Sequence, residues 1–200
     1  HTNVSLWKGG ELKSTPIGND PLPGMEQVFT HISGGENMFM PDPKIDEVKP
    51  GPVGLQSIAG LLKHLPALTC LGSPTVNSYR RLWDTGFWAP VYADWGYQNR
   101  TCSVRVSAPG RVEYRSVDSS HNPYLMGAGI LKAFEDGLDN KMDPGEPEKK
   151  NIYDAMKEGK EVDKLPLTLG EAIQRLESDD VVRSALPEDM LRVFMHYKKD

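Results

Sequence analysis

The sequence RTCSVRVSAPGRVEYR, residues 100–115, gives the clearest indication of the fold of this 200-residue chain. Valine and tyrosine alternate with polar residues on either side of the Ala-Pro-Gly sequence at 108–110, which is a turn signal. This alternation predicts strands over 101–107 and 111–117 that pair as a hairpin, and a further short strand is expected over 89–96. We therefore expect a small antiparallel sheet.

The polar positions of the last predicted strand are the ones suited to chemistry. Arg111, Glu113 and Arg115 share one face because side chains alternate along a strand. Such a face cannot pack into an apolar core, since buried charges need partners or ligands. Arginine binds phosphate and carboxylate through its planar fork, and a carboxylate suits Mg²⁺ or Mn²⁺. From this pattern alone two interpretations stay open, a solvated face of ion pairs or a site for a polyphosphate and a carboxylate.

The rest of the sequence alternates helical and loop-like segments. Apolar residues recur at three- and four-residue steps, which predicts helices over 53–71, 122–140, 168–179 and 187–198. Pro66 should kink the first helix or end its first part. Proline and glycine are frequent over 8–52 and 142–166, which predicts loops there. The predicted fold class is α+β, a small antiparallel sheet with helices.

Composition excludes several classes of protein. The net charge of −5 argues against a basic nucleic-acid-binding arm, and no apolar run approaches the roughly 20 residues of a membrane span. Two cysteines, Cys70 and Cys102, are too few for a disulfide framework and are expected to be buried thiols. We therefore expect a cytoplasmic protein with no nucleic-acid or membrane partner.

A series of motifs resembles the glutamine synthetase family. The matching segments are HTNVSL (1–6), KHLPAL (63–68), PTVNSYRRL (74–82), NRTCSVR (99–105), RVEYR (111–115), NPYL (122–125) and DPGEP (143–147). They keep the family's order, and nearly its spacing, over residues 1–5 and 37–178. The resemblance implies that residues 1–200 are the C-terminal portion of a catalytic domain. Within it, we expect a long loop or insertion at 8–52, a core with the anion site at 53–140, and a C-terminal loop with helices at 141–200.

The resemblance implies an ATP-dependent ligase. Such an enzyme phosphorylates the γ-carboxylate of L-glutamate and then lets ammonia or an amine displace the phosphate. ATP and Mg²⁺ or Mn²⁺ are the cofactors that it implies, with the remaining metal ligands on an upstream half. It also implies self-association into a ring-shaped homo-oligomer, and little or no activity for this piece alone.

The resemblance further implies a role for each matching side chain. The ligands of one divalent ion would be His1 and Glu113. The ATP contacts would be Asn3, Ser5, Arg105 and Arg111, with the two arginines on phosphate. The glutamate contacts would be Arg81, Arg100 and Arg115, and Arg100 would also lie where the phosphoryl group transfers.

One departure from the family pattern bears on the amine substrate. The family carries a G-Y-E-A-P flap whose glutamate takes a proton from ammonium, whereas this chain has GFWAP at 86–90. Trp88 cannot act as a base, but it can supply an apolar wall or a cation–π surface for an alkylammonium. We therefore expect a small alkylamine such as methylamine as the acceptor, as in a γ-glutamylmethylamide synthetase. The alternative is that Asp84 or Asp94 replaces the flap glutamate and ammonia is the acceptor.

Smaller departures and other readings stay open. Ala108 stands where many bacterial members carry a lysine, which puts one nucleotide contact in doubt. Residues 8–36 are longer than in the bacterial pattern, and Tyr153 lies where some members are adenylylated. The alternatives to an amine ligase are glutamine synthetase proper, a catalytically inactive relative, and a guanidine-kinase-like phosphotransferase.

Overall fold

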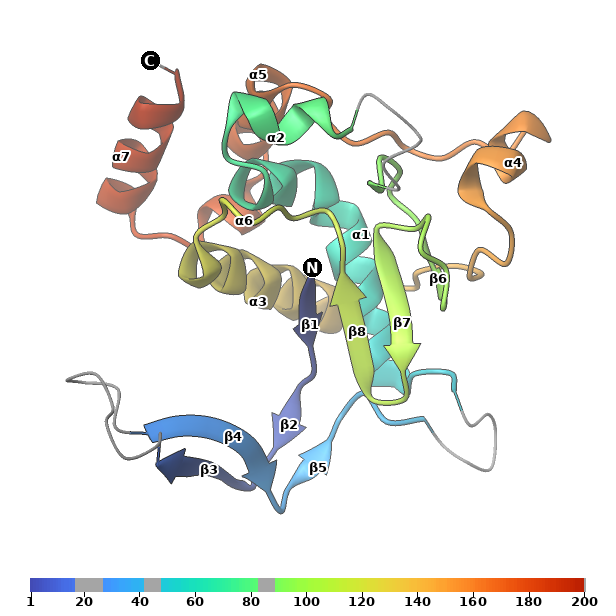
Figure 1. The fold of residues 1–200 in the computed structure, drawn as a ribbon, viewed down its shortest axis with the longest axis vertical. Coiled ribbons are helices and arrows are strands. Elements are labelled where there is room, and N and C mark those ends of the chain that lie inside the picture. Colours follow the sequence, from blue (N-terminus) through green and yellow to red (C-terminus); the bar gives the residue numbers. More distant parts are fainter. Residues whose placement is uncertain (17–26, 42–47, 83–88, 200) are drawn as a thin grey trace.

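The computed structural model describes residues 1–16, 27–41, 48–82 and 89–199. A mixed sheet lies beside a set of helices, with a separate hairpin extending away from both (Figure 1). The predicted α+β class is confirmed. Predictions that concern residues 83–88, including Asp84 and Trp88, lie outside the described residues.

A four-stranded sheet forms the centre of the fold. Its strands follow the order β1 (Thr2–Val4), β8 (Arg111–Tyr114), β7 (Val104–Ala108) and β6 (Trp95–Tyr97). The predicted hairpin is confirmed, since β7 and β8 pair in antiparallel register. The expected purely antiparallel sheet is wrong at one edge, because β6 pairs with β7 in parallel. The chain makes a short excursion between these two strands and re-enters the sheet in the same direction.

Two long helices pack against each other, and the first of them contacts β7 of the sheet. These are α1 (Pro52–Gly72) and α3 (Pro123–Asp139), both close to their predicted bounds. Their backbones approach so closely that a Cβ on Gly60 would meet the carbonyl oxygen of Ala133 at 1.9 Å. The approach is possible because glycine has no Cβ. Helix α1 continues through Pro66, so Pro66 does not end its first part, and the alternative of a kink there stays a prediction.

The C-terminal helices also agree with the sequence. Helices α5 (Leu169–Glu177) and α7 (Glu188–Lys199) match the last two predicted helices, and the short α6 (Asp180–Arg183) lies between them. Thr168 begins α5 by accepting a hydrogen bond from the backbone N–H of Glu171 at 3.1 Å, as its capping pattern predicts.

Two short helices interrupt segments with no predicted helix. Helix α2 (Val76–Arg80) has a capping box made by Thr75 and Ser78, and α4 (Ile152–Lys157) begins at Asn151. Helix α4 corrects the predicted loop over 142–166. Helices this short carry too few apolar residues to produce a periodic signal.

The predicted loop over 8–52 is wrong in its first part. Strands β3 (Glu11–Pro16) and β4 (Gln27–Ser33) form an antiparallel hairpin, and β2 (Trp7–Lys8) pairs with β5 (Glu36–Asn37). In Figure 1 the β3–β4 hairpin lies away from the helices. The extra residues of this region therefore form a two-stranded arm.

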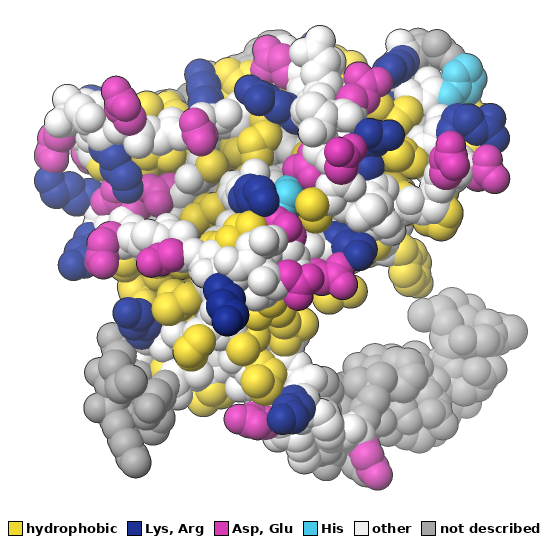
Figure 2. Space-filling model, turned by 180° about the vertical axis from the view of Figure 1, so that it is seen from behind, with side chains coloured by type: hydrophobic (Ala, Val, Ile, Leu, Met, Phe, Trp, Pro, Cys, Tyr) yellow, Lys and Arg dark blue, Asp and Glu magenta, His cyan; other side chains and the backbone are white. Residues whose placement is uncertain are grey.

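The core lies between the central sheet and the helices. Its buried side chains include Phe39, Leu65, Trp95, Tyr114 and Phe134. Figure 2 shows basic and acidic side chains interspersed over the helical part of the opposite face. None of the helices within the described residues has the length and apolar character needed to span a membrane.

Candidate active site

Glu113 lies at the centre of the candidate site. It projects from β8, and its residue is 6% exposed. Strand β1 pairs beside it, with Asn3 opposite Glu113 in the register, and brings in the first residue of the chain. The Nδ1 atom of His1 lies 2.9 Å from Oε1 of Glu113. The two residues expected to bind a metal therefore meet, although they are 112 positions apart in the sequence.

Two arginines occupy the other oxygen of the same carboxylate. Arg105 on β7 donates from Nη1 to Oε2 of Glu113 at 2.8 Å, and Arg115 donates from Nη1 to the same atom at 3.4 Å. Burial lowers the pKa of Arg115, and the charge of Glu113 acts against that effect. The sheet therefore holds a carboxylate between an imidazole and two guanidinium groups.

Arg100 borders this cluster through its backbone. Nη2 of Arg115 donates to the carbonyl oxygen of Arg100 at 3.0 Å, while the residue itself is exposed. The side chain of Arg100 is therefore accessible to solvent.

Arg81 lies just after α2 and is only partly satisfied. In the part of the chain that the structure describes, its buried Nε and Nη2 atoms have no hydrogen-bond partner. Burial lowers its pKa, and the nearby Asp118 and Tyr114 raise it. Buried donors of this kind are costly unless a ligand or water accepts from them. An anionic ligand is the natural acceptor for a guanidinium.

Asp118, a neighbour of Arg81, has no role predicted from the sequence. Burial alone would raise the pKa of its carboxyl, but hydrogen bonds from Ser120 and Ser78 and the charge of Arg81 hold it below the usual range. Its only sequence signal is its position ahead of the Asn-Pro-Tyr-Leu segment at 122–125.

The expected nucleotide contacts lie along the exposed side of the sheet. Asn3 and Arg111 are exposed, and Nε of Arg111 donates to Oγ of Ser107 at 3.1 Å. Ser5 accepts a hydrogen bond from Nε1 of Trp7 at 2.9 Å. Arg111 lies at the far end of β8 from Arg115, so the geometry does not bring all of the predicted arginines together.

The donor set around Glu113 fits a divalent ion in part. A carboxylate oxygen and an imidazole nitrogen face each other across β1 and β8, and both can ligate a metal such as Mn²⁺. Among residues 1–16, 27–41, 48–82 and 89–199, no group of three His, Cys, Asp or Glu side chains is placed to hold a metal. The described residues therefore bring together two side chains of the kind that bind such an ion, which is too few to hold it alone.

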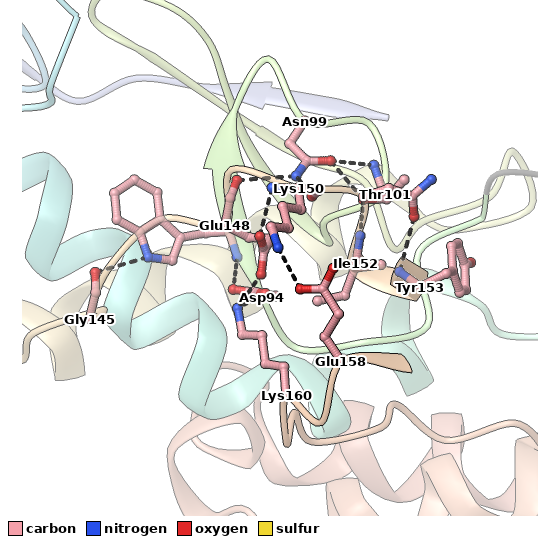
Figure 3. Close-up of polar contacts among 12 residues, drawn as sticks. Asp94, Asn99, Thr101, Gly145, Glu148, Lys150, Ile152, Tyr153, Glu158 and Lys160 are labelled. Carbon is pink, nitrogen blue, oxygen red and sulfur yellow. Dashed lines mark hydrogen bonds and ion pairs between the residues drawn. The ribbon is translucent and has the colours of Figure 1, made fainter. Parts of the chain in front are cut away.

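Asp94, one of the two candidate replacements for the flap glutamate, is engaged elsewhere. Its Oδ2 accepts from Nζ of Lys160 at 2.8 Å, and the same ammonium donates to Oε2 of Glu148 at 2.6 Å (Figure 3). Burial would lower the pKa of Lys160, but the two carboxylates raise it. Because Asp94 is 66 positions from Lys160, no local spacing signals this ion pair.

The remaining expectations concern single residues. Cys70 and Cys102 are both free and buried, as expected. Tyr153 is half-buried, its hydroxyl donates to the carbonyl oxygen of Ala89 at 3.4 Å, and its pKa is raised by burial.

The fold and the site together define a class: an α+β domain whose sheet brings arginines, a carboxylate and an imidazole together. The model of the glutamine synthetase catalytic domain matches residues 16–200. The chain therefore belongs to the glutamine synthetase catalytic-domain family, as its motifs indicate.

Curated relatives and solved structures agree with this assignment. The chain is 40% identical over 190 residues to glutamine synthetase of Pyrococcus woesei and 43% identical over 192 residues to that of Pyrococcus abyssi. Each alignment covers 92% of this chain and 42% of the relative. A GmaS–ADP complex superposes with a TM-score of 0.75 at 33% identity, covering 90% of this chain and 44% of that one. The chain thus spans less than half the length of the proteins it matches.

Proposed function

We propose that this chain forms part of the active site of an ATP-dependent ligase that joins a small alkylamine to the γ-carboxyl group of glutamate. In the first step a γ-carboxylate oxygen attacks the γ-phosphorus of ATP, and ADP leaves. In the second step the amine attacks the γ-carbonyl carbon of γ-glutamyl phosphate. Phosphate leaves with the oxygen that came from glutamate, and the amine nitrogen loses a proton.

The observation that carries the proposal is the set of buried arginine nitrogens without partners. Within the described residues these are Nε and Nη2 of Arg81, Nε of Arg105 and Nε of Arg115. A phosphoryl group in transfer spreads negative charge over its oxygens, and preorganised donors stabilise that charge. Arg81 and Arg115 are proposed to bind glutamate carboxylates, Arg105 and Arg111 the ATP phosphates, and Arg100 the transferring group and glutamate.

His1 and Glu113 are proposed to supply two ligands to a divalent ion. When bound, Mg²⁺ or Mn²⁺ would neutralise phosphate charge. Arg105 and Arg115 would keep the Glu113 carboxylate oriented by donating hydrogen bonds to its second oxygen. Asn3, in the middle of β1, and Ser5, just after that strand, are proposed to contact the nucleotide.

The nature of the amine rests on the GFWAP segment. Trp88 replaces a proton-accepting glutamate with an apolar ring, and Asp94 is paired with Lys160, so it is not a free substitute. Two matching structures are of GmaS, a γ-glutamylmethylamide synthetase. These observations favour methylamine or a similar alkylamine.

Glutamine synthetase proper is the second candidate, because the curated relatives quoted above carry that name. Here ammonia would replace the alkylamine, and Asp84 would be the remaining candidate base of the two. An inactive relative is less well supported, since the unpartnered arginine nitrogens have no structural reason to be retained.

The test is steady-state ATP turnover by a polypeptide of the relatives' full length that contains this chain. ATP cleavage should require both glutamate and an amine, and kcat/KM should be higher for methylamine than for ammonia. Replacing Trp88 by Glu should shift this preference toward ammonia, with Trp88→Phe as the matched control. Clear preference of the wild type for ammonia would contradict the amine assignment, and turnover independent of glutamate would contradict the ligase.

The chain alone should be inactive, and the complete protein should form a ring-shaped homo-oligomer. Both are expected from family membership. Assay of the 200-residue chain and light scattering of the complete protein test them.

A further inference from the structure

We infer that Asn99 and Thr101 are positioning residues that fix the backbone of Arg100, and that the segment 144–160 is the frame to which they bind. The inference rests on the proposed function, in which Arg100 acts on the transferring phosphoryl group. It assigns a role to a polar network that the ligand-binding residues do not explain (Figure 3).

The side-chain amide of Asn99 is saturated with hydrogen bonds. Its Oδ1 accepts from the backbone N–H of Thr101 at 3.0 Å and from the Thr101 hydroxyl at 2.7 Å. Its Nδ2 donates to the carbonyl oxygens of Glu148 at 3.1 Å and Lys150 at 2.7 Å. An asparagine amide offers two donors and two acceptor sites, so this arrangement allows a single orientation.

Thr101 continues the network on the other side of Arg100. Its hydroxyl accepts from the backbone N–H of Ile152 at 3.0 Å, at the start of α4. The carbonyl oxygen of Arg100 itself accepts from Arg115 at 3.0 Å. The backbone of Arg100 is thus anchored through both neighbouring residues and through its own carbonyl oxygen, while Arg100 remains exposed.

An ion pair and two hydrogen bonds hold the frame to β6 and to Asp94, the residue before it. Lys160 lies between the buried carboxylates of Asp94 and Glu148. The backbone N–H of Glu148 donates to the carbonyl oxygen of Trp95 at 2.8 Å, which fixes the same segment to β6. The indole of Trp95 also donates to the carbonyl oxygen of Gly145, at 3.3 Å.

Such a network has value for catalysis because an arginine is useful only where the charge develops. A misplacement of about 1 Å can cost about a hundredfold in rate even when the cause lies outside the reacting groups. If the network only stabilised the fold, its removal would lower stability without slowing the chemical step. The two roles therefore differ in their kinetic signature.

A double-mutant cycle on the full-length protein tests the inference. Asn99→Ala should lower kcat by about 10- to 100-fold and leave KM for ATP nearly unchanged. Combined with Arg100→Ala, it should cause no further loss, because a positioning residue acts only through the group that it positions. Thr101→Ser should keep kcat and Thr101→Val should lower it. Glu158→Gln removes an exposed ion pair with Lys150 in the same segment and should leave kcat unchanged.

The outcomes separate this inference from the proposed function. Additive losses in the cycle, or an unchanged kcat in Asn99→Ala, would overturn the positioning role in a wild type that is active. If Asn99→Ala does not fold, equal kcat values for Thr101→Val and Thr101→Ser would overturn it. A wild type that shows no glutamate-dependent ATP turnover would overturn the proposed function and this inference together.

Discussion

Two of the groups of buried charge in the described residues contrast with each other: one lies on the sheet around Glu113, and the other lies among α1, α3 and the start of α6 around His64. In the second group, Nδ1 of His64 lies 2.7 Å from Asp179 and Nε2 lies 2.8 Å from Asp136. Lys63 also donates to Asp136 at 2.8 Å. Both ring nitrogens face carboxylate oxygens, which can only accept, so this geometry favours the protonated ring in which both nitrogens donate.

The sheet group differs because it has donors left over. Within the described residues, arginine nitrogens of Arg81, Arg105 and Arg115 have no partner, whereas both ring nitrogens of His64 are paired. A complete network stabilises a fold, and an incomplete one is held at a cost in stability. The complete network around His64 therefore indicates a structural cluster, and the incomplete one on the sheet indicates a ligand site.

Glu113→Ala should have the largest effect on stability and activity together. It removes a carboxylate that pairs with buried arginines and that is also proposed to bind the metal. It leaves Arg115, which is 4% exposed, without its ion-pair partner. We expect a loss of about 3–5 kcal/mol in the free energy of unfolding and a fall in turnover of at least about a hundredfold. Denaturant titration and the ligase assay measure these, with Glu113→Gln as the control that keeps the side chain's shape. A loss in one property alone would break the comparison.

Arg81→Met should separate activity from stability. Turnover should fall by about 10²- to 10³-fold if Arg81 stabilises developing charge. The free energy of unfolding should stay the same or rise, since a buried group with unpaired donors is replaced by an apolar one. The same two assays test this. A stability loss as large as that of Glu113→Ala would show that Arg81 is structural.

His64→Leu should give the reverse result. It leaves the carboxylates of Asp136 and Asp179 without the cation between them, which should cost about 3–5 kcal/mol of stability. The kinetic constants of the folded enzyme should not change, because His64 lies in the helical cluster. A fall in kcat without a fall in stability would contradict the structural assignment.

The pH dependence of stability offers a finer test of the same cluster. Burial alone would lower the pKa of His64, but the hydrogen bonds and charges of Asp179 and Asp136 raise it above its ordinary value. Its stabilising contribution should be complete below about pH 6.5 and should be lost as the pH rises through the raised value. The same contacts lower the pKa of Asp136 and Asp179, so their contribution should be lost only in acid. Tm measured from pH 5 to pH 9 should fall more in the wild type than in His64→Gln. Equal slopes would contradict the assignment.

Lys63→Ala should have the smallest effect. Its side chain is 52% exposed, so its ion pair with Asp136 is screened by water. We expect a stability change of about 0–1 kcal/mol, measured by denaturant titration. A larger loss would mean that the cluster depends on Lys63 as well as on His64.

The central hairpin and the four longer helices could be predicted because their patterns are local. The alternation over 104–114 and the periodicity over 52–72 come from neighbouring residues, and both elements formed as expected. The parallel β6 could not be placed in this way, because its pairing depends on how the chain re-enters the sheet. The β3–β4 hairpin was missed because prolines and glycines nearby favoured a loop, although the apolar residues of VFTHI at 28–32 are typical of a strand.

The candidate site divides in the same way. The shared face of Glu113 and Arg115 could be predicted from strand alternation, and the approach of His1 only from the family resemblance. The pairing of Lys160 with Asp94 and Glu148 could not be predicted, because contacts between distant segments leave no periodic trace in one sequence. The missing partners of Arg81 likewise became visible only once burial was known.

An oxygen label can show whether the sheet face supports transfer through γ-glutamyl phosphate. Glutamate carrying ¹⁸O in its γ-carboxylate would be supplied with ATP and methylamine to the full-length protein. We predict that each phosphate released carries one oxygen from glutamate, because the bridging oxygen leaves with phosphorus. Phosphate released without the label would contradict transfer through γ-glutamyl phosphate.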